Sequence, residues 1–102
     1  MEYEEYRNKK GQYHRIDGPA YINDIRKVWY YKGQFHRLDG PAYIEGNYYK
    51  VWCMNGGYHR LEGPAYINGD YQEWWINHKS ITNPEDYIHE IIEDCAYGIW
   101  RI

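Results

Sequence analysis

The sequence predicts a mainly β protein: an antiparallel meander of stacked hairpin repeats with one C-terminal α-helix. The first observation is a ten-residue string, F-H-R-L-D-G-P-A-Y-I at 35–44, that returns almost unchanged at 13–22 and 58–67. The second is its period, because the histidines of the string lie 22 and 23 residues apart, as is typical of stacked repeats. Three tryptophans keep the same phase: Trp29, Trp52 and Trp74. Three copies followed by a half copy give three and a half repeats of about 22 residues.

Length and composition indicate one domain. The chain has 102 residues, 14 of them Tyr, so rings supply most of the area that can be buried. We assign 1–102 to a single domain, with the repeat array at 6–80 and a C-terminal helix and tail at 82–97. The opening M-E-Y-E-E lacks the pattern of a signal peptide, and no apolar run is long enough to span a membrane. These features predict a cytoplasmic protein without a membrane partner.

The charge is divided between the repeats and the ends. Residues 6–80 hold eleven Lys or Arg against seven Asp or Glu, whereas the two ends hold one Arg against eight acids. Such a mildly basic body argues against binding of extended nucleic acid. The acidic ends fit a solvated helix beside the sheet.

The elements follow in chain order. Residues 2–7 read as an opening strand, and 8–12 as a turn that corresponds to 31–34 and 54–57. A Gly in each turn supplies the positive φ that a tight hairpin requires. The D-G-P or E-G-P that follows must begin a strand or lie at an edge, because Pro donates no ladder hydrogen bond. A-Y-I then starts a short strand at Ala20, Ala42 and Ala65.

Each strand that carries a Trp presents two apolar faces. One face holds Trp29, Trp52 and Trp74; the opposite face holds Val28, Tyr30, Val51, Cys53 and Trp75. Apolar faces need cover, and the segment after Thr82 supplies a candidate. Pro84 and Glu85 suit a first helical turn, and Ile88, Ile91, Ile92 and Cys95 then form one stripe at helical spacing.

The spacing W-x-x-x-G-x-x-H-R-x-D-G-P-A resembles the MORN-like repeats of bacteriophages and giant viruses, over 6–92. The chain departs from that pattern at Trp75 and at His78, which stands where the turn Gly is usual. The resemblance implies an elongated sheet that serves as a binding platform, and it implies no catalytic residue. By analogy, such a phage protein would inhibit a host enzyme or a defence complex.

The repeated H-R-x-D lacks the context that catalysis requires. It is not the H-R-D of a kinase, and no phosphate loop or D-F-G accompanies it. Equivalent histidines lie roughly 10 Å apart in stacked hairpins, too far to share a metal ion. We therefore expect a protein that is not an enzyme and has no cofactor. A structural interpretation pairs Arg15 with Asp17, Arg37 with Asp39, and Arg60 with Glu62 in a ladder of ion pairs.

Two functions from different classes remain open. The first is a non-enzymatic module that binds an unidentified host protein through Val28, Tyr30, Val51, Cys53 and Trp75. The alternative is sequestration of a small signalling nucleotide by a phosphate clamp, formed by His14, Arg15, His36, Arg37, His59 and Arg60. An apolar face left open by one chain would also suit a second copy, which predicts a homodimer.

Overall fold

The computed structural model describes residues 2–82, and these form one large antiparallel sheet with two small hairpins beside it. The sheet contains, in spatial order, β1 (Tyr3–Glu5), β2 (Tyr21–Asn23), β3 (Arg26–Val28), β6 (Tyr43–Glu45), β7 (Tyr49–Val51), β10 (Tyr66–Asn68), β11 (Tyr71–Ile76) and β12 (Lys79–Ile81). The hairpins join β4 (Tyr30–Tyr31) to β5 (Gln34–Phe35) and β8 (Cys53–Met54) to β9 (Gly57–Tyr58). The predicted mainly β antiparallel meander is confirmed, whereas the predicted helix and tail lie outside the described residues.

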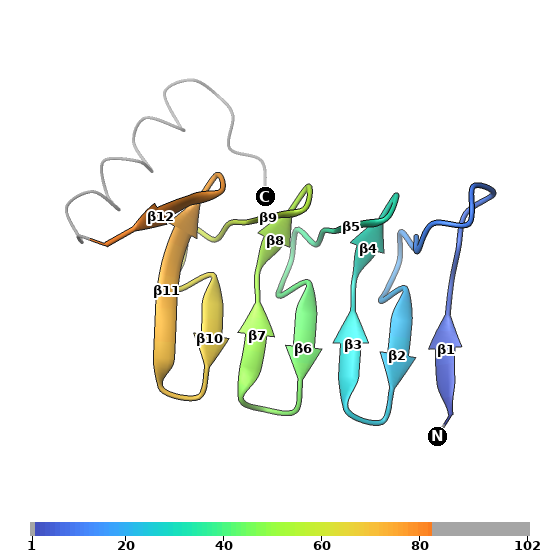
Figure 1. Cartoon of the computed structure of the whole chain (residues 1–102), viewed down its shortest axis with the longest axis horizontal. Coiled ribbons are helices and arrows are strands. Elements are labelled where there is room, and N and C mark those ends of the chain that lie inside the picture. The colour runs from blue at the N-terminus through green and yellow to red at the C-terminus, as the bar shows by residue number, and fades with distance from the viewer. Residues whose placement is uncertain (1, 83–102) are drawn as a thin grey trace.

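The strands lie side by side in a single layer (Figure 1). Tight turns at the lower edge of this view join β2 to β3, β6 to β7 and β10 to β11. At the upper edge the chain makes a hairpin, crosses toward the next strand pair and descends again. The molecule measures only 16 Å along its shortest principal axis. Side chains therefore have one sheet to pack on, which explains why the buried core is small.

Three alanines mark the points where the descending strands join the sheet. The amides of Ala20, Ala42 and Ala65 each donate to the carbonyl of the neighbouring strand at 2.8 Å, and all three side chains are fully buried. The regular strand begins at the following Tyr, one residue later than the A-Y-I pattern predicted. A methyl group is the largest side chain that these enclosed positions admit without displacing their neighbours.

The upper hairpin turns depend on backbone that few residues adopt. In the β4–β5 and β8–β9 turns both central residues have positive φ: 49° and 81° at Lys32 and Gly33, and 53° and 87° at Asn55 and Gly56. This is the mirror-image turn that matches the twist of a two-residue hairpin. The third turn, between β11 and β12, has Asn77 and His78 at 48° and 68°. The hairpin therefore forms although His78 replaces the expected Gly.

A reciprocal exchange of large and small residues accommodates His78. The Gln12 side chain packs over the turn residue Gly33 of the next segment, and Gln34 packs over Gly56 in the same way. In the last segment the order is reversed, because His78 occupies the space that a Cβ at Gly57 would need. Each of these contacts therefore contains one bulky side chain. In the first two it is a Gln that packs over a turn glycine, and in the last it is the turn residue His78, which packs over Gly57.

This exchange predicts that positions 57 and 78 are energetically coupled. Gly57→Gln should destabilise the protein by about 1–3 kcal/mol, since the new side chain meets the His78 ring. Adding His78→Gly restores the arrangement seen at Gln34 and Gly56, and should recover most of that loss. Urea unfolding of the wild type, both single variants and the double variant measures the coupling. Additive losses would show that the two side chains do not compete for one space.

Candidate functional site

The motif arginines, Arg15, Arg37 and Arg60, lie flat against aromatic rings of the preceding strand. The guanidinium carbon of Arg37 lies 3.8 Å from the ring centroid of Trp29, and that of Arg60 lies 3.7 Å from Trp52. Arg15 stacks at 4.0 Å on Tyr6, which takes the place of Trp in the first segment. Each stack fixes a motif loop, 14–19, 36–41 or 59–64, against the strand that precedes it.

Polar contacts hold the Arg37 guanidinium in the same place. Its Nη1 donates to the Pro41 carbonyl at 3.0 Å, and equivalent bonds join Arg15 to Pro19 and Arg60 to Pro64. A Cβ at Gly40 would approach the Arg37 guanidinium carbon to 2.8 Å, so a larger residue at this position would have to displace the end of the arginine side chain. The string R-x-D-G-P-A is therefore explained as one packing unit: an arginine, the glycine beneath it and the carbonyl that it bonds.

The predicted ladder of ion pairs forms at two of its three places. Arg15 Nε donates to Asp17 at 3.1 Å, and Arg37 Nε donates to Asp39 at 2.9 Å. Within residues 2–82, no ion pair joins Glu62 to Arg60, and the prediction is wrong there. The Arg60 stack and its bond to Pro64 persist without that ion pair, so ring and carbonyl contacts are common to all three loops while the carboxylate is not.

The motif histidines link each segment to the next. Nδ1 of His14 accepts from the amide of Lys32 at 2.9 Å, and His36 accepts from Asn55 at 3.0 Å. His59 accepts from Asn77 at 2.8 Å. Every donor is the first positive-φ residue of a hairpin turn, and the following amide bonds a backbone carbonyl of the same preceding segment. Each turn is therefore held by two bonds from the segment before it.

This arrangement requires neutral histidines. Because Nδ1 accepts from an amide, protonation there would place one N–H against another. Burial lowers the pKa of His36, and burial followed by the nearby His78 lowers that of His59 to about 4. The motif histidines thus act as hydrogen-bond acceptors in the fold.

Replacing the motif arginine should show which of its contacts matters most. Arg37→Lys removes the planar group that stacks on Trp29 and should cost about 1–2 kcal/mol of unfolding free energy. Asp39→Asn removes only an exposed ion pair and should cost at most about 0.5 kcal/mol. Urea titration of both variants provides the comparison. An equal or larger loss from Asp39→Asn would mean that the ion pair, and not the stack, fixes the loop.

The low pKa of His59 predicts loss of stability in acid. The unfolded chain, with an ordinary His pKa of ~6.5, binds the proton first, so stability is complete above that pH and falls as the pH drops toward 4. The loss that His59 contributes should be on the order of 3 kcal/mol. His59→Asn keeps an acceptor near Nδ1 but does not titrate. Its urea midpoint should therefore change less than that of the wild type between pH 7 and 4.5, and an unchanged pH dependence would refute this role for His59.

The predicted phosphate clamp stays a prediction. Its residues His14, Arg15, His36, Arg37, His59 and Arg60 lie in rows, and the contacts above use Nδ1 of each histidine and Nη1 of each arginine within the fold. Within residues 2–82, no group of three or more His, Cys, Asp or Glu is placed to hold a metal ion. In the same part of the chain, no helix is long and apolar enough to cross a membrane.

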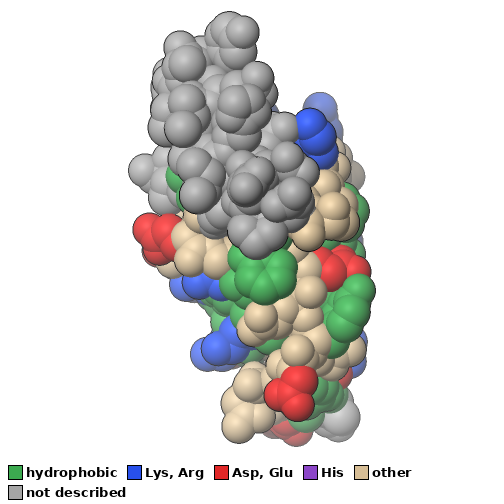
Figure 2. All heavy atoms as spheres, turned by 90° about the vertical axis from the view of Figure 1, so that its left-hand side faces the viewer, with side chains coloured by type: hydrophobic (Ala, Val, Ile, Leu, Met, Phe, Trp, Pro, Cys, Tyr) green, Lys and Arg blue, Asp and Glu red, His purple; other side chains and the backbone are tan. Residues whose placement is uncertain are grey.

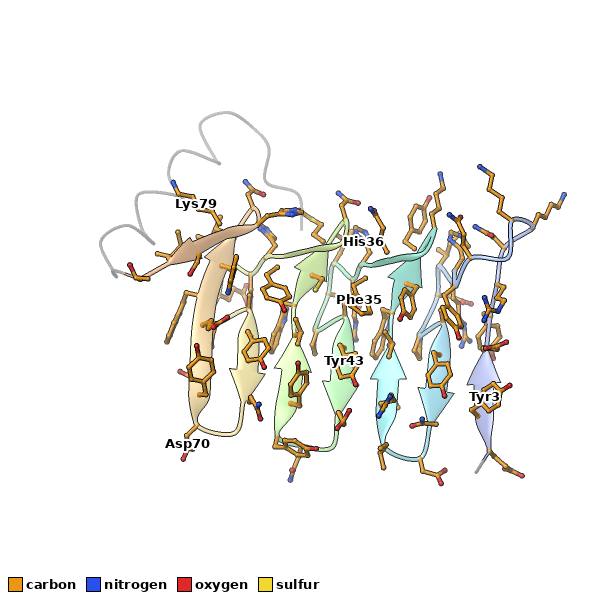
Figure 3. All side chains as sticks on the ribbon, in the orientation of Figure 1. Tyr3, Phe35, His36, Tyr43, Asp70 and Lys79 are labelled. Atoms are coloured by element: carbon orange, nitrogen blue, oxygen red, sulfur yellow. The ribbon has the colours of Figure 1, made fainter. Side chains whose placement is uncertain are left out.

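A second feature lies on one face of the sheet, where aromatic rings form a continuous row. Neighbouring ring centroids are 4.9–6.3 Å apart. We call this row the aromatic ladder: Tyr3, Tyr13, Tyr21, Tyr30, Phe35, Tyr43, Tyr49, Tyr58, Tyr66, Tyr71 and Trp75. Figure 3 shows Tyr3, Phe35 and Tyr43 along it. Strand register places the opposite face at Ile22, Ile44 and Ile67, with Lys27 and Lys50 between them.

Carboxylates hold several ladder rings by their polar ends. Tyr43 donates to Glu45 at 2.7 Å, and Glu73 accepts from both Tyr71, at 2.6 Å, and Trp75, at 3.0 Å. These bonds lower the pKa of Glu45 and of Glu73, and the Tyr71 bond is the largest cause for Glu73. Figure 2 looks onto the β12 end of the sheet and shows hydrophobic and acidic side chains next to each other. The ladder therefore combines ring surface with fixed negative charge.

The structure separates the five residues predicted to form a binding face. Val28, Val51 and Cys53 are buried, so the expectation that they are open to a partner is wrong. Val51 and Cys53 belong to the buried cluster that the rings pack against, and burial raises the pKa of the Cys53 thiol to about 12. Tyr30 and Trp75 are half-buried members of the ladder. The other ladder tyrosines were missed, although their recurrence in phase with the A-Y-I string was a signal for them.

Comparison with family models, curated proteins and solved structures finds no match to this chain. The geometry of its described residues is therefore the basis for any functional assignment.

Proposed function

We propose that this protein is a non-enzymatic module that binds another protein through the aromatic ladder. The observation that carries this proposal is the ladder's continuity across the whole sheet, with Tyr71 58% and Tyr3 59% exposed. Aromatic side chains are the residue type that most often anchors protein interfaces. A row of this length gives a partner ring surface along every strand pair.

Contacts within the ladder restrict several of its rings before any partner binds. Neighbouring rings and carboxylates restrict Tyr43, Tyr71 and Trp75, so docking a partner orders few additional rotamers. Tyr and Trp have only two side-chain torsions each, which keeps that entropy cost small. A pre-formed surface of this kind supports binding better than a loop-borne surface of similar composition.

The resemblance to MORN-like repeats supports a more specific version of the proposal. In it, three and a half repeats closed by a C-terminal helix form the platform, and the partner is an unidentified host protein in the host cytoplasm. Inhibition of a host enzyme or defence complex would follow from occupying the partner's surface. A second copy of the chain is the competing occupant of the ladder, as in the predicted homodimer.

The motif residues weigh against the nucleotide alternative. Arg37 already stacks on Trp29 and donates to Pro41 and Asp39, and His36 accepts from Asn55. A phosphate bound there would have to replace contacts that hold the loop. The ladder requires no such rearrangement, so protein binding is the function that we propose.

Mutation of the ladder tests the proposal. The protein immobilised on resin should retain a specific host protein that is lost with Trp75→Ala and with Tyr71→Ala, because both changes remove ring surface from one end of the ladder. Each truncation should weaken binding by about 1–3 kcal/mol, which is roughly fivefold to 150-fold. Affinity for the captured protein, once purified, is measured by calorimetry.

A matched control comes from the opposite face. Lys27→Ala changes an exposed side chain away from the ladder and should leave binding unchanged. Sedimentation of the free protein shows whether a second copy occupies the ladder instead. The proposal fails if ladder and control variants bind alike, or if Trp75→Ala dissociates a homodimer without changing any other interaction.

A further inference from the structure

The face opposite the aromatic ladder contains two equivalent hollows between successive motif loops, here called the Trp slots. One, of about 420 Å³, is lined by Leu38, Asp39, Trp52, Met54, Leu61 and Glu62 together with the two arginines of its loops. The other, of about 750 Å³, lies one segment earlier and is lined by Ile16, Asp17, Trp29, Tyr31, Leu38 and Asp39 with their loop neighbours. Similar residue types, at equivalent positions of the repeat, therefore line both slots.

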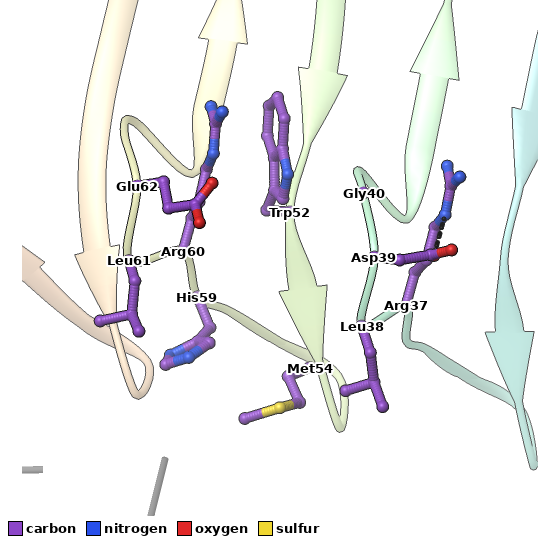
Figure 4. A pocket seen from close by; sticks show the side chains of 10 residues that line it. All are labelled: Arg37, Leu38, Asp39, Gly40, Trp52, Met54, His59, Arg60, Leu61 and Glu62. Atoms are coloured by element: carbon purple, nitrogen blue, oxygen red, sulfur yellow. Dashed lines mark hydrogen bonds and ion pairs between the residues drawn. The ribbon is translucent and has the colours of Figure 1, made fainter. Parts of the chain in front are cut away.

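In each slot an arginine covers one face of the indole ring. Arg60 lies against Trp52, and Figure 4 shows the ring between this arginine and the Asp39–Gly40 loop across the slot. Leu38 and Met54 border the same space, and the Leu38 side chain is half exposed. A flat apolar group that enters the slot would lie against the indole, and these aliphatic side chains line the other end of the same hollow.

The indole N–H groups of the slots remain available. Within residues 2–82, neither Trp29 nor Trp52 has a hydrogen-bond partner for Nε1, whereas Trp75 donates its own to Glu73. A slot ligand with a free carbonyl oxygen beside its apolar group would satisfy this donor.

Each slot is lined by two arginines and two carboxylates, and the aspartates are far more exposed than the arginines that they pair with. In the pair of Arg37 with Asp39, the arginine side chain is 22% exposed and the carboxylate 86%; Arg15 and Asp17 show 27% and 85%. The arginines are covered by their rings and carbonyl bonds, so the rim presents the carboxylates to a ligand. Charge complementarity therefore favours a partner with cationic groups at the same interval as the carboxylates.

The spacing of the slots restricts the conformation of such a partner. With two strands per segment, equivalent residues recur roughly every 10 Å. A polyproline II chain has three residues per turn and rises ~3.1 Å per residue, so it returns to the same face every ~9.3 Å. A β-strand directs residues three apart to opposite faces. An α-helix returns after seven residues, ~10.5 Å, but its carbonyls are bonded internally and none is free for the indole N–H.

We propose that the Trp slots bind a proline-rich, lysine- or arginine-containing segment in the polyproline II conformation. One proline ring of each triplet enters a slot against Trp29 or Trp52, its carbonyl accepts from the indole N–H, and one cationic side chain of each triplet meets Asp17 or Asp39. Proline restricts the free segment to this conformation, so little ordering remains for binding. The proposal does not depend on the aromatic ladder.

Synthetic peptides test this proposal on the full chain. A peptide of four Pro-Pro-Lys triplets should change the tryptophan fluorescence on titration and yield a saturable dissociation constant. A peptide of Pro-Pro-Glu triplets should bind at least tenfold more weakly because its charge opposes the rim. A peptide of Ala-Ala-Lys triplets, which has the same charge without the prolines, should also bind at least tenfold more weakly.

Variants locate the site. Asp39→Asn should weaken binding of the Pro-Pro-Lys peptide roughly fivefold and reduce its salt dependence. Leu38→Ser should weaken it by a similar factor, and Tyr71→Ala on the ladder should leave it unchanged. Circular dichroism confirms that each variant is folded. Binding that is absent, equal for all three peptides, or sensitive to Tyr71→Ala but not to Asp39→Asn and Leu38→Ser would overturn the proposal.

Discussion

The stacking of an arginine guanidinium on an aromatic ring is the contact on which the regularity of this structure depends. The ring comes from the ascending strand, and the arginine comes from the loop that leads to the next descending strand. Arg37 on Trp29 and Arg60 on Trp52 show the same geometry, and Arg15 repeats it on Tyr6. The guanidinium also donates to a proline carbonyl, and this bond fixes the direction in which the loop returns to the sheet. The recurrence of the string H-R-x-D-G-P-A follows from this requirement.

Successive segments are joined differently, through polar contacts between the hairpin turn and the histidine of the segment before it. A turn with two positive-φ residues directs two amides outward, and a histidine nitrogen and a carbonyl accept them. This use of histidine explains its invariance among the three motif loops without catalysis or metal binding. It also makes the array dependent on neutral imidazoles, which burial favours for His36 and His59.

Within residues 2–82 the sheet has no second layer to enclose its rings, and this constraint shapes both faces. On one face the tyrosines pack on one another and donate hydrogen bonds to carboxylates, forming a continuous surface. On the other, the motif loops rise between the tryptophans and leave hollows at the interval of the segments. The two faces therefore differ in chemistry: phenol rings with fixed acids on one, and indoles beside exposed aspartates on the other. The two binding proposals therefore concern different surfaces of the same sheet.

The sequence by itself determined the period, the positions of the turns and the antiparallel β architecture. These features depend on local chemistry: glycine at positive φ, proline at the start of a strand and alternation along the strands. Residue types gave less indication of two local structures. One is the arginine stack on Tyr6, which replaces Trp, and the other is the hairpin turn at Asn77 and His78, which replace the usual turn pair. In the latter case a complementary change at Gly57, distant along the chain, decides whether the turn is tolerated.

Only the tertiary structure decided which residues of the apolar faces are exposed. Alternation placed Val28, Val51 and Cys53 on the same face as Tyr30 and Trp75, but their depth depends on rings that come from neighbouring strands and cover them. The burial of the motif arginines also depends on other segments. The sequence suggested that their charges were available to a ligand, but Arg37 and Arg60 each stack on the ring of a Trp eight residues earlier in the chain. Burial is a property of contacts between segments, and a period in sequence specifies which positions are equivalent without specifying what covers them.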